Sequence, residues 1–121
     1  PLKQLKTILE KEDVVALRQQ AQEVKVSDEM FQYLVALTEK TRDHEYLLQG
    51  ASPRASVALL NMTKAMALFE GREFAIPEDV YSVIKEVFGH RVKLSPKGRA
   101  AGMNEQQVIE EIFRSVKAPA T

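Results

Sequence analysis

The sequence predicts an all-α fold, a bundle of four to five helices around one hydrophobic core. Apolar residues recur at helical spacing along the chain and almost never alternate with polar residues as they do in strands. Serine, proline, asparagine and glycine, the residues that begin and end helices, stand between these periodic segments. With 121 residues, of which 45% are hydrophobic, the chain can bury such a core without disulfides.

The first part of the chain predicts two amphipathic helices. Residues 11–24 carry apolar side chains along one stripe, after an entry segment at 1–9 that could hold a very short extended stretch. Ser27 is a good N-cap for the next helix, because its hydroxyl can accept hydrogen bonds from the free amides of the first turn. This second helix is expected to fray over 42–45 and to bury Met30, Tyr33, Leu34, Leu37 and Thr41.

Residues 54–70 predict a third helix of a different kind. Apolar side chains lie on nearly every face of it, which is typical of a central helix surrounded by the others. Gly71 is expected to end this helix, as a C-terminal glycine commonly does.

The segment "IPEDV" (76–80) opens the fourth helix. Pro77 stands at the first turn, where its missing amide costs nothing, and two acidic residues follow at the positive end of the helix dipole. Gly89 is expected to stop the helix.

Residues 90–104 are expected to form a polar connector, in which Val92 and Leu94 could make a brief extended stretch. Asn104 and Gln107 have the spacing of a capping box, which predicts the start of the last helix. The buried stripe of that helix is expected to comprise Val108, Ile109, Ile112, Phe113 and Val116.

The whole chain, 1–121, is expected to be one domain whose end, 117–121, is a frayed tail. Seventeen basic residues offset seventeen acidic ones, so no overall field would attract nucleic acid or an anionic membrane. No apolar run approaches the roughly 20 residues of a membrane span. The absence of cysteine fits a reducing compartment, and we expect a cytoplasmic protein. The first residue, a proline instead of a methionine, suggests a piece of a longer protein.

The sequence lacks the motifs of a self-contained enzyme. It has no G-x-x-x-x-G-K-[ST] loop for phosphates and no apolar strand that ends in paired acids for magnesium. No serine or threonine stands in a nucleophile motif. We therefore expect no catalysis by this chain alone.

The remaining polar clusters predict little chemistry. His44 and His90 have no ligand spacing, and the side chains of 43–45 diverge on a helix, so no metal site is expected. One basic cluster in the last connector could contact phosphates, although such a connector is more often simply solvated. Its residues are His90, Arg91, Lys93, Lys97 and Arg99.

The stretch "GASPRASVALL" (50–60) places a single arginine, Arg54, at the start of the third helix. Ser52 is placed to cap that helix and Pro53 to fill its first turn, while Gly50 is expected to supply a backbone angle that other residues avoid. The free amides and the planar guanidinium of such a helix start can together bind an anion. Spacing alone favours an ordinary exposed residue at a helix start over an anion-binding one.

The longer segment "GASPRASVALLNMTKAMALFEGREFAIPEDV", followed by "HRV", resembles the C-terminal lid domain of MoxR-type AAA+ ATPases. In that family a G-A-S-P-R-A turn opens one helix and a P-E-D-V segment opens the next. The resemblance covers essentially the whole chain. Ile76 departs from it, because the family usually has threonine or serine at that helix cap.

The resemblance implies a lid that packs over ATP and magnesium held by a separate α/β domain of the same chain. Arg54 would be the sensor-2 residue that reaches the γ-phosphate, positioned by Gly50, Ser52 and Pro53. In relatives of this clade the lid can serve a neighbouring subunit's nucleotide, so the γ-phosphate could belong to the same subunit or to its neighbour. Neighbouring subunits of a ring, a hexamer by analogy, and an unidentified protein client of chaperone-like remodelling would be the partners. The alternative is a stand-alone helical adaptor or histone-like module with no nucleotide role.

Overall fold

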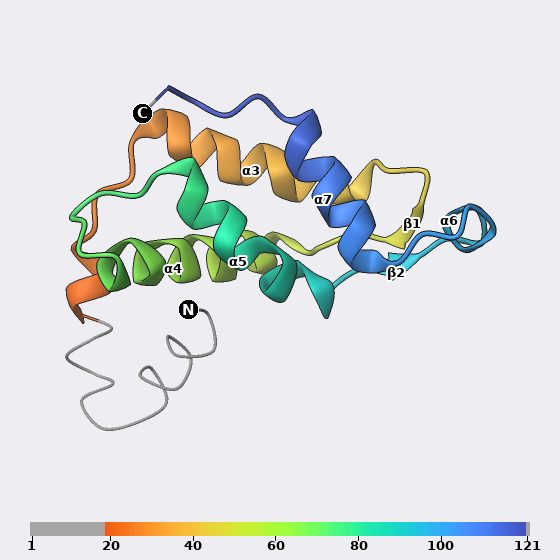
Figure 1. Ribbon diagram of the computed structural model, residues 1–121, viewed down its shortest axis with the longest axis horizontal. Helices are drawn as coiled ribbons and strands as arrows, with labels where there is room; N and C mark the ends of the chain where they lie inside the picture. Colours follow the sequence, from red (N-terminus) through yellow and green to blue (C-terminus); the bar gives the residue numbers. More distant parts are fainter. Residues whose placement is uncertain (1–18, 121) are drawn as a thin grey trace.

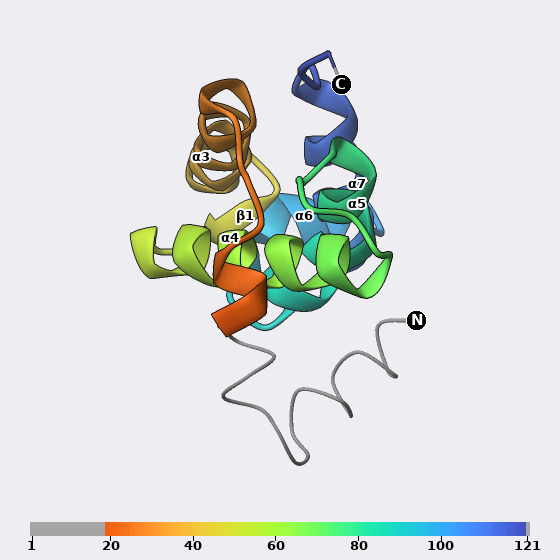
Figure 2. The same ribbon diagram turned by 90° about the vertical axis from the view of Figure 1, so that its left-hand side faces the viewer.

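The structure is a computed structural model that describes residues 19–120. Its elements are α3 (Asp28–Arg42), β1 (Leu47–Gln49), α4 (Pro53–Phe69), α5 (Pro77–Gly89), β2 (Lys93–Leu94), α6 (Pro96–Ala100) and α7 (Glu105–Ser115). The predicted all-α bundle is confirmed. α5 packs against α4 and α7, and α3 contacts the same two helices (Figure 1 and Figure 2). The only β-structure in the described range is short.

The first predicted helix is described only at its end. Residues 19–22 are helical, and Ala21 and Val24 are buried as the stripe predicts. The rest of the expected helix and the entry segment at 1–9 lie outside the described residues. Within residues 19–120, no helix has the length and apolar character needed to cross a membrane.

The predicted N-caps of α3 and α7 are confirmed. The Oγ of Ser27 accepts from the amide of Met30 at 3.1 Å. Asn104 and Gln107 form a reciprocal capping box, in which each side-chain oxygen accepts from the other residue's amide, at 2.8 and 2.9 Å. These bonds satisfy amides that a helix start otherwise leaves free.

The two glycines expected to end helices behave differently. Gly71 adopts a φ of 78° after α4, and the amides of Gly71 and Arg72 donate back to the carbonyls of Leu68 and Ala67, each at 2.9 Å. This is the hydrogen-bond pattern of a Schellman motif. α5 ends at Gly89 as expected, but Gly89 is still helical and is not among the glycines with positive φ; its lack of a side chain leaves room for Gln106.

The start of α5 depends on an acid. Ile76 has no polar side chain to cap the helix, but Asp79 accepts from the amide of Ile76 at 2.9 Å and forms an ion pair with Arg72. Asp79 is almost fully buried. Burial raises the pKa of the Asp79 carboxyl, and the Ile76 hydrogen bond and the Arg72 charge oppose that rise. The pair therefore ties the α4–α5 connection to the helix that follows it.

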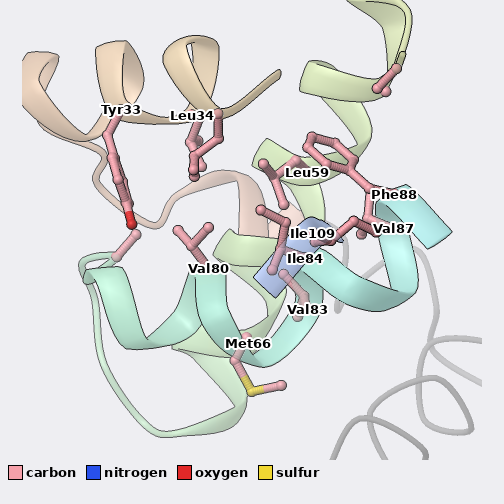
Figure 3. Packing of buried hydrophobic residues seen from close by; sticks show 14 of the residues in the cluster. Tyr33, Leu34, Leu59, Met66, Val80, Val83, Ile84, Val87, Phe88 and Ile109 are labelled. Atoms are coloured by element: carbon pink, nitrogen blue, oxygen red, sulfur yellow. The ribbon is translucent and has the colours of Figure 1, made fainter. Parts of the chain in front are cut away.

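The core is centred on α5 and not on α4. Figure 3 shows the side chains of Val80, Val83, Ile84 and Phe88 from α5 among those of the neighbouring helices, and all four are fully buried. The prediction that α4 is surrounded on all sides is wrong, because Val57 is 56% exposed.

Small residues explain the error about α4. Three of its fully or nearly buried positions are alanines, Ala55, Ala65 and Ala67, which let α4 approach its neighbours closely. Larger apolar side chains, including Leu60 and Phe69, are only half-buried. A helix with apolar residues all round does not reveal which face its neighbours cover.

The last connector contains more structure than predicted. The extended stretch appears as β2, which pairs antiparallel with an unpredicted strand, β1, through Leu47 opposite Leu94 and Gln49 opposite Lys93. The short helix α6 was also missed. The Oγ of Ser95 accepts from the amide of Gly98 at 3.1 Å and donates to a carbonyl 50 residues earlier, that of Glu45, at 2.7 Å. Residues 117–120 have no regular structure.

A polar network joins α5 to α7 at the surface. Glu110 accepts from the hydroxyl of Tyr81 at 2.7 Å and pairs with Lys85 at 2.5 Å and Arg114 at 2.7 Å. Hydrogen bonding to Lys85, followed by that to Tyr81, lowers the pKa of Glu110 to about 2.

Candidate functional site

Arg54 is the second residue of α4 and its side chain is exposed. Its guanidinium makes no hydrogen bond or ion pair with another residue of the described range. Pro53 occupies the first helical position, as predicted. The guanidinium is therefore a cation at a helix start, where the helix dipole disfavours positive charge unless an anion is also bound.

Ser52 occupies the N-cap position with extended backbone angles, but its side chain makes no capping hydrogen bond. The expected hydroxyl cap is therefore absent. The hydroxyl of Ser56 instead donates to the carbonyl of Pro53 at 2.6 Å, within the first turn. What fixes this helix start must lie elsewhere.

The turn before α4 is held by the last turn of α3. Ala51 is fully buried, and its amide donates to the Oγ1 of Thr41 at 2.8 Å. Its carbonyl accepts from the Nε of Arg42 at 2.9 Å. Thr41 in turn donates to the carbonyl of Thr38 at 2.6 Å. Both backbone polar groups of Ala51 are thus bound to α3, three residues before Arg54.

Position 50 requires glycine because there is no room for a side chain, and not because of an unusual backbone angle. In the described residues, positive φ angles among glycines occur at Gly71 and Gly102, and Gly50 is not one of them. A Cβ at position 50 would instead lie 2.4 Å from the carbonyl oxygen of Thr41. The expectation of a special angle is wrong; glycine lets the turn lie directly against the backbone of α3.

Sequence reasoning placed Thr41 on the buried stripe but missed that its hydroxyl anchors the turn. The available signal was a threonine at a fully buried position near a helix end, where a buried hydroxyl requires a partner. Arg42 was expected only to lie in a fraying helix end. Both residues belong to the site because they hold the turn that carries Arg54.

The other polar candidates lie apart from this turn. The Nδ1 of His44 accepts from the amide of Tyr46 at 3.0 Å, and its Nε2 lies 3.5 Å from Glu111, so this histidine stabilises the turn that follows α3. His90 is exposed at the end of α5. Among the described residues, no group of three or more histidine, aspartate or glutamate side chains could hold a metal ion.

The basic cluster of the last connector is exposed throughout. Lys97 pairs with Glu45 at 3.0 Å, and Arg91 donates to the carbonyl of Val87. The first contact joins the connector to the turn that follows α3, and the second stays within the end of α5.

Comparison with known proteins identifies the architecture. The model of the AAA lid domain family matches residues 39–112, a range that contains the anchored turn, α4, α5 and most of α7. The chain belongs to the AAA lid domain family. The lid is therefore favoured over the stand-alone adaptor or histone-like module.

Individual relatives agree with this assignment. The chain is 33% identical to the uncharacterized protein YeaC of Bacillus subtilis over 98% of its own length and 37% of that protein. It is 32% identical to Chaperone MoxR1 of Mycobacterium tuberculosis over 96% of its own length and 33% of the relative. The crystal structure of a "putative ATPase" from Cytophaga hutchinsonii superposes with a TM-score of 0.77 at 32% identity, covering 84% of this chain and 34% of that one.

The predicted resemblance to a MoxR-type lid is confirmed by these matches. The chain spans about a third of the length of these relatives.

Proposed function

We propose that this lid senses nucleotide for a MoxR-type AAA+ ATPase, and that Arg54 is the sensor-2 residue that contacts the γ-phosphate of ATP. One observation carries the proposal: the guanidinium of Arg54 is exposed and has no partner within the described residues. The turn before it is fixed, because the amide and the carbonyl of Ala51 are both hydrogen-bonded to α3. A positioned but unpaired arginine is suited to a phosphate, because its planar fork can donate two parallel hydrogen bonds.

In this proposal, the other parts of the active site lie outside these 121 residues. An α/β domain of the same polypeptide would hold ATP and magnesium, which supply the reacting phosphate and its charge compensation. Residues 50–53 position Arg54 and make no contact with the reacting atoms. Ring neighbours, in a hexamer, and a client protein for chaperone-like remodelling in the cytoplasm complete the proposal. The chaperone part is supported by the name of the relative Chaperone MoxR1.

The test uses the complete ATPase with three proteins: wild type, Arg54→Ala and Arg54→Lys. Steady-state hydrolysis and melting temperature are measured on each. We expect the alanine variant to melt near the wild type, because Arg54 makes no described contact, and to hydrolyse ATP far more slowly. Lysine should restore activity only in part, since it cannot present a planar fork.

The opposite pattern, a lowered melting temperature with normal turnover, would make Arg54 a structural residue. Binding of ADP, which lacks the γ-phosphate, should change little in either variant. Equal loss of ADP and ATP binding would show that Arg54 does not discriminate between them.

A further inference from the structure

The last described residues, 117–120, lie against the domain without polar contacts, and we call them the tail segment. The tail segment has no regular structure and runs from the end of α7 toward the start of α3 (Figure 1). Within the described range, none of its residues makes a hydrogen bond or an ion pair. Pro119 is half-buried, whereas its neighbours Ala118 and Ala120 are exposed. A segment held in this way can be displaced without breaking a polar contact of the domain.

Two grooves flank the tail segment. The first has a volume of about 370 Å³ and lies between the start of α5 and the end of α7, where it is lined by Pro77, Glu78, Tyr81, Phe113, Arg114 and Ala118. The second has a volume of about 680 Å³ and is lined mostly by apolar side chains, among them Met30, Phe74, Ile76 and Ala120.

The two grooves adjoin along the tail segment. Ala118 of the first groove and Ala120 of the second are two residues apart, which is at most about 7 Å in an extended chain. On the facing wall, Ile76 of the second groove directly precedes Pro77 of the first. The tail segment therefore crosses the boundary between the grooves, and its displacement would join them into one.

A buried hydroxyl lies close to this boundary. Tyr33 of α3 is only 4% exposed, and its hydroxyl has no hydrogen-bond partner. Its ring packs edge-on against Phe113 of the first groove, with the ring centroids 6.1 Å apart. Figure 3 shows the phenol of Tyr33 pointing from α3 toward the start of α5, where Ile76 and Pro77 separate the grooves. Buried hydroxyls normally have a partner, so this one is a polar contact that the tail segment leaves unused.

We propose that the two grooves form one binding site for an extended, uncharged segment of a partner protein, and that the tail segment is a strap that competes with it. The strap itself shows which chemistry the site accepts, because residues 118–120 read Ala-Pro-Ala and lie against both grooves. A partner segment on the same path can also accept the hydrogen bond of the Tyr33 hydroxyl through a backbone carbonyl. The strap does not make that bond.

The walls favour an uncharged polypeptide over a charged ligand or an anionic membrane. Two aromatic side chains of the grooves are exposed, Phe74 by 54% and Tyr81 by 40%, and their burial against apolar residues is favourable. The charged residues along the grooves, Lys25, Glu78 and Arg114, have both signs and create no field of one sign.

A tethered strap sets the strength of the competition. A segment on a short flexible connection has an effective concentration of about 1 mM. If strap and partner segment each bind the open site with a dissociation constant of about 100 µM, the site is open about one tenth of the time. The apparent dissociation constant of the partner segment is then raised about tenfold.

The test uses the complete ATPase and, as the probe, a fluorescent peptide with the sequence of residues 115–121, SVKAPAT. The double substitution Ala118→Asp and Ala120→Asp releases the strap, because carboxylates are disfavoured against apolar walls. In that background Phe74→Asp changes the site, and Leu48→Asp is the matched control on β1, outside both grooves. All four native residues are exposed, so folding should be retained. Fluorescence anisotropy without nucleotide gives the dissociation constant of the peptide.

We expect the released protein to bind the peptide about tenfold more tightly than the wild type does. Phe74→Asp should remove this gain, and Leu48→Asp should keep it. Equal dissociation constants for the wild type and the released protein, or no binding by either, would overturn the proposal. Binding that persists in Phe74→Asp would place the peptide elsewhere and would also overturn it.

Two other occupants are distinguished by the same proteins. A smaller assembly of the released protein, followed by light scattering, would show that the tail segment occupies a groove of a neighbouring copy and would overturn the strap. Binding of the released protein to vesicles of anionic phospholipid, without binding of the peptide, would identify a membrane surface and overturn the partner segment. None of these measurements involves nucleotide or Arg54, so this inference and the proposed function can fail separately.

Discussion

Thr41→Val should selectively destabilise the turn that carries Arg54. Valine keeps the shape of threonine but removes the Oγ1 that accepts from the amide of Ala51 at 2.8 Å. Ala51 is fully buried, so water cannot replace the lost acceptor. A buried donor left without a partner costs about 1–3 kcal/mol, and we expect the free energy of unfolding to fall by that amount.

Thr38→Val is the matched control, because it makes the same chemical change on the same helix at a nearly fully buried position. Its hydroxyl only donates to the carbonyl of Leu34 within α3, at 2.9 Å, and removing it orphans no buried amide. We expect this variant to lose less than about 1 kcal/mol.

Urea unfolding followed by far-UV circular dichroism gives both free energies. If Thr41→Val costs no more than Thr38→Val, the hydroxyl of Thr41 does not anchor the turn. The account of how Arg54 is positioned would then be wrong, whatever Arg54 contacts.

Three further outcomes follow from the packing and the charges. Gly50→Ala should destabilise the fold by about 1–3 kcal/mol in thermal or urea melts, because its Cβ would lie 2.4 Å from a backbone oxygen. Leu59→Ala, at a fully buried position, should cost about 2–5 kcal/mol, and Leu60→Ala, at a half-buried one, clearly less; equal costs would contradict the burial described for α4. The pKa of Glu110 is about 2 in the folded protein and 4.5 in the unfolded chain. The ionised carboxylate therefore stabilises the fold above pH 4.5, and this stabilisation is lost as the pH falls toward 2. The melting temperature of the wild type should therefore be higher than that of Glu110→Gln at neutral pH. The two melting temperatures should converge as the pH is lowered from 4.5 toward 2.

A helix start could be predicted from the sequence where its cap bonds residues that are close together in the sequence. Ser27 bonds the amide three residues on, and Asn104 does the same with Gln107, so each motif is complete within four residues of sequence. Gly71 likewise ends α4 with bonds to the turn before it. Such features require no knowledge of the tertiary fold.

The errors concern contacts between residues distant in sequence. Ser52 has the right identity and position for a cap but does not form one, and the turn is held instead by Thr41, ten residues before Ala51. Glycine at position 50 is explained by the nearby backbone of α3, which the sequence alone does not place. β1 was missed because three residues carry almost no periodicity and its partner β2 lies over 40 residues away.

The anchoring of the turn has a mechanical consequence for the lid. Because Ala51 is bonded to Thr41 and Arg42 through both its amide and its carbonyl, the start of α4 cannot shift alone without breaking two partly or fully buried hydrogen bonds. At the other end of α4, the pair of Arg72 and Asp79 holds the α4–α5 connection to the start of α5. A force on Arg54 is thus transmitted to α3 and α5 as well as to α4. If Arg54 contacts the γ-phosphate as proposed, we expect loss of that phosphate to release the lid as one rigid body, with motion at its junction to the nucleotide domain.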